Sequence, residues 1–487
     1  MNIMLRKSYI LLAIGLIAVV ACLVTFFVIR RTDSYACALP ASTNALVRMD
    51  VPTLLQHGSV SPNDLYPLSG VCDEASVSQW LNASKPVYAF VDDANNIGLL
   101  CALTDAGALE QALQRLADAG RASSVERQRS LQWCCVEQRW LLCFDSRRLL
   151  VMGPAVGSEQ DALRQTMAKL MEQSRDDSGL ATDIHERLAS ADAPVAASLS
   201  TSLLSSFLQG SMAQQLGLQD LLSERLEISL DASANALVAQ FDIPLAGDAA
   251  QRRLQTISGL LHPVTGVLAG DAPADAALWL TLNLRGTDVL TYLRSFPVVR
   301  TALVAANTVV DVDAMLRAVD GDVAVSTSAD GAGWMLSAQL HDADFLKQAD
   351  YWLSSPPLLS LMRLRRVAPQ HFAIDTHSGE TYYFGVRDGV LYVTNTSSTV
   401  AAPAQSGPNA HVNSAALAGT RVFATLDVDA LMRMLGTAGG IVPGSVTDNI
   451  SHVDLCLPAE GAMELRLQGR DGRNLLQALL QAMKNEP

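Results

Sequence analysis

Two histidines and an aspartate lie close together between His371 and His377. Imidazole and carboxylate side chains in combination suit zinc and related transition metals. If one strand ran through this stretch, the alternation of its faces would bring His371, Asp375 and His377 to one side. The residues 376–379 are typical of a hairpin turn, however, which would remove His377 from that face. We therefore expect polar turn residues beside an exposed histidine, and no metal site.

Other residue patterns that could do chemistry also have structural explanations. The paired acids Asp92-Asp93 and Asp176-Asp177 fall at expected turns, where carboxylates bond locally to the backbone, and neither pair belongs to a calcium-binding loop pattern. The glycine-rich stretch Gly436–Ser445 follows an expected helix and has no Lys, whereas phosphate-binding loops open a helix. We expect a connector there.

The sequence lacks the local motifs of common enzyme classes. There is no GxSxG elbow, HExxH pair, P-loop, or GxGxxG turn opening a helix after a strand. We therefore predict a protein that is not an enzyme, with no catalytic, cofactor-binding or metal-binding residues. The six tryptophans fall on expected strands or helices, where core packing is the ordinary role and a ligand groove is the alternative. They are Trp80, Trp133, Trp140, Trp279, Trp334 and Trp352.

The N-terminal region contains a long uncharged segment, Ser8–Ile29. About 22 residues of helix are enough to cross a bilayer core of roughly 30 Å. Two basic residues lie on each side, so charge does not orient the segment. We expect an uncleaved signal-anchor with the rest of the chain on the extracytoplasmic, periplasmic side. The alternatives are a lipoprotein signal ending at Cys22 and an ordinary cleaved signal.

Beyond this segment the chain carries seven cysteines, and an odd number cannot pair completely within one chain. They are Cys37, Cys72, Cys101, Cys134, Cys135, Cys143 and Cys456. Adjacent residues of a strand point to opposite faces, so Cys134 and Cys135 are poorly placed to share a metal or redox site. A disulfide from either one to Cys143 stays open, and buried free thiols acting as small hydrophobic side chains are the alternative.

The charge balance is acidic, which argues against nucleic acid as a partner. The 487 residues include 49 acidic and 35 basic side chains, a net charge of −14. Such a chain is repelled by phosphate backbones. Hydrophobic residues make up 49% of the chain and charged residues 17%, which is typical of folded proteins.

One pattern recurs along the chain and organises its elements. Pro40–Leu55 reads as a Pro/Ala turn, a short strand ending in Asp50, and a helix that this Asp can cap. Pro273–Leu293 repeats the pattern with Asn283 in the capping place. Looser copies occupy Val195–Leu208 and Val422–Leu435.

Matching landmarks indicate a tandem duplication. Pro40 and Pro273 are 233 residues apart, Asp105 and Asp342 are 237 apart, and Val195 and Val422 are 227 apart. In each half we expect a hairpin, a helix and a three-stranded meander after the first strand-helix pattern. The meander of the first half leads into two helices at 162–171 and 182–188, which the Ala/Ser/Pro-rich stretch 396–419 replaces in the second half.

These patterns predict an α+β fold, with helices packed on one face of mainly antiparallel sheets. We divide the chain into an anchor at 1–30, a juxtamembrane spacer at 31–38, a first half at 39–265 and a second half at 266–487.

The arrangement resembles a group of bacterial, Bacteroidetes-type envelope proteins of unknown function. The resemblance rests on Pro40–Leu55, on Pro273–Leu293, and on hairpin-helix-meander modules such as Pro86–Met152. It implies a bacterial source and an extracytoplasmic location, and it assigns no catalytic residues.

We therefore expect a membrane-tethered, non-enzymatic envelope protein that acts as a scaffold or interaction module for another envelope component. The alternative is a ligand- or lipid-binding protein with a cleft between its two halves. An unrecognised hydrolase is a third, weaker possibility. A binding protein should contain an enclosed apolar cavity, whereas a scaffold should show a packed core and an exposed apolar patch.

Overall fold

A computed structural model describes residues 33–60, 79–203, 225–242, 248–308, 310–354, 362–396, 409, 412, 417–435 and 447–484. The chain divides into two compact units. The first unit comprises Met1–Ala250, Pro443–Asn449 and Gly469–Pro487, and the second comprises Gln251–Val442 and Ile450–Gln468. Helix α9 (Asp248–Gly259) runs across the division.

The strands of the first unit pair antiparallel in the order β4-β5-β6-β7-β3-β2-β1-β8-β9-β10. They are β1 (Thr43–Met49), β2 (Val87–Asp92), β3 (Ile97–Ala102), β4 (Glu126–Gln128), β5 (Leu131–Val136), β6 (Trp140–Phe144), β7 (Arg148–Gly153), β8 (Val195–Ser200), β9 (Arg225–Ala232) and β10 (Ala236–Asp242). β2 and β3 form the predicted hairpin, and β5 to β7 form the predicted meander.

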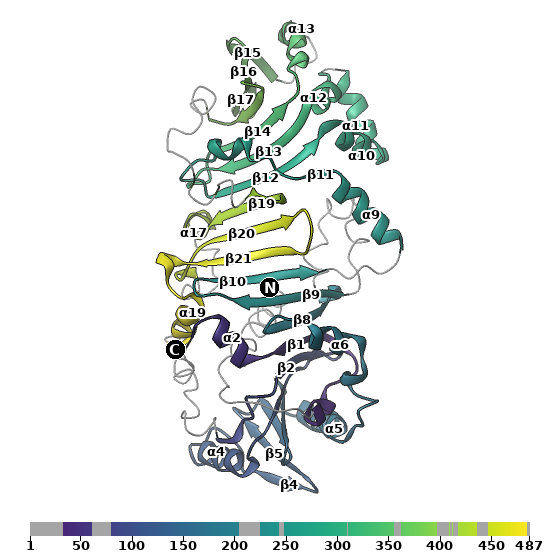
Figure 1. Ribbon diagram of the computed structural model, residues 1–487, viewed down its shortest axis with the longest axis vertical. Coiled ribbons are helices and arrows are strands. Elements are labelled where there is room, and N and C mark those ends of the chain that lie inside the picture. The colour runs from purple at the N-terminus through teal and green to yellow at the C-terminus, as the bar shows by residue number, and fades with distance from the viewer. Residues whose placement is uncertain are drawn as a thin grey trace. The chain divides into compact units, whose positions relative to one another are not determined.

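Both faces of this sheet are covered, which differs from the predicted cover on one face: α4 and α5 lie on opposite sides of β5 (Figure 1), and the adjacent residues Leu141 and Leu142 are both buried. One core lies on the face that carries Leu141. Leu100, Leu141 and Met152 from the strands pack there against Met167 of α5 and Leu188 of α6, with η1 completing the cover. The helical segments are η1 (Asp33–Ala38), α2 (Val51–His57), α4 (Ala106–Asp118), α5 (Glu159–Glu172), η4 (Gly179–Ala181), α6 (Asp183–Ser190), η5 (Thr201–Leu203), η10 (Arg470–Gly472) and α19 (Leu475–Lys484).

The second unit repeats the antiparallel pattern in the order β15-β16-β17-β18-β14-β13-β12-β19-β20 (Figure 1). Its strands are β11 (Leu261–His262), β12 (Leu278–Arg285), β13 (Val319–Thr327), β14 (Trp334–Leu340), β15 (Met362–Ala368), β16 (His371–Thr376), β17 (Thr381–Arg387), β18 (Val390–Thr394), β19 (Thr420–Asp427), β20 (Ile450–Pro458) and β21 (Met463–Gly469). The short strand β11 pairs with the end of β12.

Helical segments lie on both faces of this second sheet, which differs from the predicted cover on one face. Tyr392 packs in a core with Leu268 of η7, whereas its neighbour Leu391 packs in a core with Trp352 of α13. Adjacent strand residues point to opposite faces, so the two cores are on opposite sides. The helical segments are η7 (Val267–Asp271), α10 (Gly286–Arg294), α11 (Pro297–Asn307), α12 (Val312–Ala318), η8 (Asp344–Gln348), α13 (Ala349–Ser354) and α17 (Val428–Leu435).

The two sheets agree in register as well as in order. In the first unit one row of paired residues runs through Ala197, Val47, Ala89, Leu99, Val151, Leu142 and Cys134. In the second unit the corresponding row runs through Ala424, Leu280, Val325, Leu336, Val393, Phe384 and Phe372. Val47 and Leu280 are 233 residues apart, the spacing of the recurring prolines.

The predicted helix cap is confirmed at Asp50 and wrong at Asn283. The Asp50 carboxylate accepts a hydrogen bond from the Thr53 amide (3.2 Å). In the looser copy Val422–Leu435, for which no cap was predicted, the Asp427 carboxylate accepts one from the Ala430 amide (2.7 Å). Asn283 does not cap α10, whose N-cap is Arg285. The Asn283 side chain instead donates to buried Asp322 (3.0 Å), because β12 continues for two residues beyond Asn283.

The α+β class and the antiparallel sheets are confirmed. The predicted anchor Ser8–Ile29 and the glycine-rich stretch Gly436–Ser445 lie outside the described residues, as does most of 396–419. Within the described part of the chain, no single helix is long and apolar enough to cross a membrane. The consecutive helices α10 and α11 satisfy the length and composition test only together, and they are bent by 117°.

Candidate functional site

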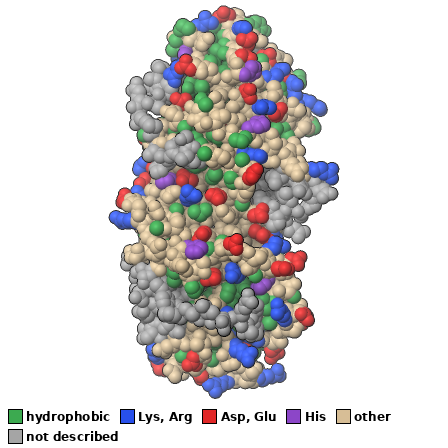
Figure 2. All heavy atoms as spheres, in the orientation of Figure 1, with side chains coloured by type: hydrophobic (Ala, Val, Ile, Leu, Met, Phe, Trp, Pro, Cys, Tyr) green, Lys and Arg blue, Asp and Glu red, His purple; other side chains and the backbone are tan. Residues whose placement is uncertain are grey.

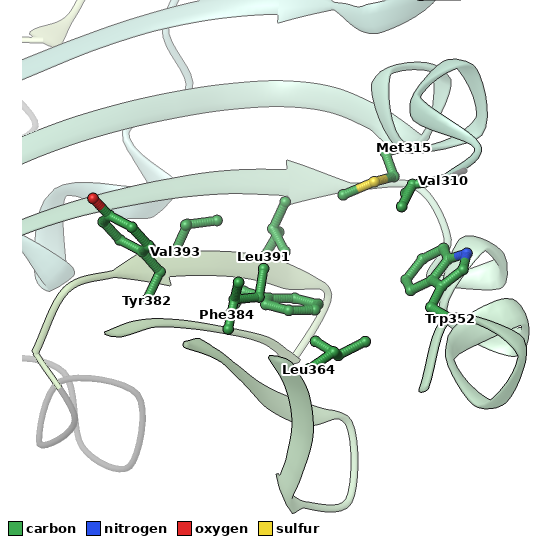
Figure 3. Close-up of a pocket in the computed structure, with 9 residues that line it drawn as sticks. Val310, Met315, Trp352, Leu364, Tyr382, Phe384, Leu391 and Val393 are labelled. Atoms are coloured by element: carbon green, nitrogen blue, oxygen red, sulfur yellow. The ribbon is translucent and has the colours of Figure 1, made fainter. Parts of the chain in front are cut away.

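A pocket of about 190 Å³ opens in the second unit, between the meander β15–β18 and the helical segments α12 and α13 (Figure 3). Every residue that lines it has an aliphatic, thioether or aromatic side chain. These residues are Val310, Met315, Trp352, Leu364, Ile374, Tyr382, Phe384, Leu391 and Val393.

The strand wall of the pocket follows from the register of the meander. Ile374 pairs with Leu364 on one side and with Tyr382 on the other. Phe384 pairs with Val393. Because alternate strand residues share a face, these side chains point to the same side of the sheet. The strand wall is therefore continuous and hydrophobic.

The helical wall of the pocket is formed by α12, which Asp311 caps, and by the buried indole of Trp352 in α13. Asp311 accepts a hydrogen bond from the Ala314 amide (2.9 Å) and so fixes the start of α12, which carries Met315. Trp352 of α13 is 2% exposed, and its buried indole nitrogen has no hydrogen-bond partner. In Figure 3 this nitrogen lies on the side of the indole away from Phe384, so the hydrocarbon part of the ring faces the strands.

Tyr382 directs its one polar atom out of the pocket. Its hydroxyl donates a hydrogen bond to the exposed Glu380 carboxylate (2.6 Å), and in Figure 3 the oxygen points away from the other labelled residues. This hydrogen bond to Glu380 raises the pKa of Tyr382 above its usual value. The lining therefore presents no acid, base or nucleophile to a bound molecule. It is suited to holding a hydrocarbon group.

The size of the pocket is sufficient for such a group. An engineered cavity of about 150 Å³ lined by Leu, Ile and Phe stays dry and binds benzene. The present pocket is somewhat larger, at about 190 Å³, and similarly apolar. Each methylene group transferred into it from water contributes about 0.8 kcal/mol.

The candidate metal ligands of the sequence do not come together. β16 ends at Thr376, so His377 lies in the turn as predicted. The Asp375 carboxylate bonds to the Arg365 guanidinium (3.0 Å), which holds the pKa of that carboxyl below its usual value. The His371 ring is hydrogen-bonded to the Pro369 carbonyl (2.7 Å). Among the described residues, no group of three His, Cys, Asp or Glu side chains is arranged to hold a metal.

The paired aspartates also have local roles. Asp92 accepts hydrogen bonds from the backbone and the side chain of Asn96 (both 2.8 Å) and so closes the β2–β3 turn, as the sequence predicts. Asp176 and Asp177 lie in the predicted turn between α5 and η4. Ser174 donates to the Asp177 carboxylate (2.7 Å).

The six cysteines of the described part of the chain are free, at positions 37, 101, 134, 135, 143 and 456. A disulfide to Cys143, which the sequence left open, is not formed. Cys143 faces Trp133 across the strands, while Cys134 faces Leu142. Burial raises the pKa of both Cys101 and Cys143 to about 12, so these thiols stay protonated at neutral pH.

The tryptophans mainly pack in the cores, as predicted. Trp80, Trp133, Trp279 and Trp352 are all less than 10% exposed, and Trp140 and Trp334 are half-buried.

The sequence predicted the helix that carries Trp352 and the strands of the meander, but it did not predict the pocket between them. Hydrophobic alternation indicates which side chains face the core. It does not indicate how closely the meander packs against α12 and α13.

No curated protein matches the sequence. A crystal structure described as crystal form I of TP0453 is 9% identical, with 47% of this chain and 86% of that chain covered and a TM-score of 0.26. Crystal form III of TP0453 is 10% identical, with 47% and 87% covered and a TM-score of 0.29. Scores at this level carry no argument about fold or function.

The sequence does match one family over most of its length. Residues 69–432 match the family described as "Domain of unknown function (DUF4836)". The match includes residues of both units. Because it covers well over half of the 487 residues, the chain belongs to the DUF4836 family, a family of unknown function.

Proposed function

We propose that this protein is a non-enzymatic binding protein, and that the pocket of its second unit holds the hydrocarbon part of a lipid or a similar small molecule. One observation carries the proposal: nine hydrophobic or aromatic residues line a half-open pocket of about 190 Å³ without directing a polar group into it. A well-packed core leaves few voids larger than a water molecule. An apolar space of this size is a binding site for an apolar group.

The setting that we propose for this binding is the cell envelope. The uncharged segment Ser8–Ile29 would tether the chain to a membrane, with the two units on the extracytoplasmic side. The matching strand order and register of the two sheets support an origin by tandem duplication. The interior of the second unit, rather than a cleft between halves, would then hold the ligand.

A scaffold for another envelope protein is the second candidate, and an edge strand favours it. Among the described strands, β15 pairs with β16 alone, and Val367 at its end is 54% exposed. An open edge can accept an added strand from a partner. Arg363 on β15 would suit an acidic partner segment, whereas Arg365 and Arg366 are already paired with Asp375 and Asp350.

A photoreactive fatty acid tests the proposed ligand site. The full chain in lipid nanodiscs is irradiated with an acyl chain that carries a diazirine near its methyl end, and the cross-linked peptides are mapped by mass spectrometry. We expect labels on β17 and β18, where Phe384 and Leu391 line the pocket. The substitution Val393→Phe fills part of the pocket and should lower this labelling at least about fivefold.

The matched control is Val367→Phe, which adds the same ring at an exposed position outside the pocket. It should leave the labelling of β17 and β18 unchanged. Equal labelling in wild type and both variants, or labels that avoid these strands, would contradict the binding proposal. A stoichiometric protein partner on β15 in the unlabelled sample would favour the scaffold instead.

A further inference from the structure

Helix α11 (Pro297–Asn307) of the second unit is rich in apolar residues that are not buried in a core. None of its residues is buried, although most are Val, Ala or Leu. Val298 is 75% exposed and Val304 is 63% exposed. The neighbouring helices behave differently, since α10 buries Leu290 and α12 buries Ala318. Figure 1 shows the three helices together beside β12, β13 and β14.

The exposed side of α11 is mostly apolar, with Thr301 and Arg300 as its exposed polar residues before Asn307. Val298, Ala302 and Ala305 follow one another at helical spacing, and all three are exposed. Arg300 is the one charged residue of this helix, which has no acidic side chain in a protein with 49 of them. At the junction with α10, the rings of Tyr292 and Phe296 meet edge to face at 5.2 Å.

The small size of this face argues against a stable protein interface. A helix of 11 residues is about 16 Å long and, with its side chains, about 10 Å wide. One face of it offers far less than the ~800 Å² that each partner of a typical stable complex buries. A bilayer surface has no such minimum, because an apolar helix face can lie in the interface and gain from each side chain it inserts.

We propose that α11 docks on a lipid bilayer through its exposed side, with Val298 and Val304 inserting on either side of Thr301. The uncharged segment Ser8–Ile29 supports this occupant, because a chain tethered to a bilayer meets that same bilayer at a high effective concentration. Weak insertion of a few side chains is then sufficient. The lack of acidic residues on α11 avoids repulsion by anionic headgroups, and Arg300 can lie among them.

A hydrophobic photoreagent dissolved in the bilayer tests the proposal. The full chain is reconstituted in vesicles of phosphatidylethanolamine and phosphatidylglycerol, labelled, and digested with trypsin. The readout is the peptide Ser295–Arg300, which contains Val298 and none of the pocket residues. We expect strong labelling of this peptide in the wild type. The double variant Val298→Asp/Val304→Asp should lower it at least about tenfold, which corresponds to ~1.4 kcal/mol of lost binding.

The control is the double variant Val156→Asp/Val367→Asp, which changes two valines of similar exposure, 57% and 54%, outside α11. It should keep the wild-type labelling of Ser295–Arg300. Thermal melting by circular dichroism should be unchanged in both variants, because all four positions are exposed. An unlabelled Ser295–Arg300 peptide in the wild type overturns the proposal, whether or not Ser8–Ile29 is labelled. A protein or a second copy cross-linked to α11 in the vesicles also overturns it.

Discussion

At the scale of residues, Asp322 illustrates how a single buried carboxylate holds the second unit together. It is fully buried and accepts five hydrogen bonds, from the amides of Thr265, Gly266 and Val267, the Thr265 hydroxyl and the Asn283 side chain. Gly266 has a φ of 78°, a conformation that favours glycine and turns consecutive amides toward the carboxylate. Asp322 thereby fixes the segment before η7 to β13.

Replacing Asp322 should therefore destabilise the second unit strongly. In Asp322→Ala several buried donors lose their acceptor, and we expect a loss of about 3–5 kcal/mol in the free energy of unfolding. Urea denaturation measures it. Asp320 on the same strand is the control, because its carboxylate is 55% exposed and lies 3.8 Å from the exposed Arg285. Asp320→Ala should cost less than about 1 kcal/mol, and an equal loss in the two variants would refute this role.

The buried thiols predict how stability depends on pH. Burial raises the pKa of Cys101 and Cys143 to about 12, above that of about 8.5 in an unfolded chain. The unfolded state therefore releases its thiol protons first as the pH rises. Their contribution is constant below pH ~8 and is lost progressively up to pH ~12. Between pH 8.5 and 9.5 the free energy of unfolding should fall by about 1 kcal/mol for each thiol.

The double variant Cys101→Ala/Cys143→Ala isolates this effect, because it removes both thiols and leaves the other titrating groups in place. Its pH slope over the same interval should be shallower than that of the wild type by about 2 kcal/mol in total. Identical slopes in urea titrations at the two pH values would show that these thiols ionise freely in the folded protein.

At the scale of elements, two helices of the first unit differ in how their N-termini are capped. Asp105 accepts hydrogen bonds from the amides of Gly107 (2.8 Å) and Ala108 (3.2 Å) at the start of α4. Ser158 occupies the same place before α5, but its side chain makes no capping hydrogen bond. The two helices therefore form a natural comparison.

The substitution Asp105→Ala should cost about 1 kcal/mol in the free energy of unfolding, because two amides at the start of α4 lose their acceptor. Ser158→Ala should cost only a few tenths of a kcal/mol, since no hydrogen bond is removed. Chemical denaturation of the two variants side by side measures the difference. A larger loss in Ser158→Ala than in Asp105→Ala would contradict the capping geometry.

Some elements could not be predicted from sequence because tertiary contacts decide them. β15 follows from its pairing with β16, and its run of arginines weakens any strand signal. α11 starts at Pro297 and has no polar cap, so the sequence gives little indication of a second helix there. Asn283 fitted the expected cap, yet the strand continued past it and its side chain turned to Asp322. An Asn at this place favours a helix cap, but the buried Asp322 carboxylate accepts the hydrogen bond of its side chain instead.

At the scale of the whole molecule, the order of the elements along the chain predicted the repeated architecture better than the chemistry of single side chains did. The spacing of Pro40 and Pro273 marked two similar series of elements, and the sheets of both units share one strand order and one register. The pocket was not predictable in this way. It depends on how far the helix that carries Trp352 stands from the strand that carries Phe384, and hydrophobic periodicity contains no such distance.

The most direct test of the central claim is native mass spectrometry of the full chain, purified gently from its own cells. If the second unit is a binding site for an apolar group, the wild type should carry one discrete small molecule or lipid per chain. Val393→Phe should lose that molecule, and Val367→Phe should retain it. A wild-type chain that carries nothing, or one whose bound molecule is unaffected by Val393→Phe, would contradict the account.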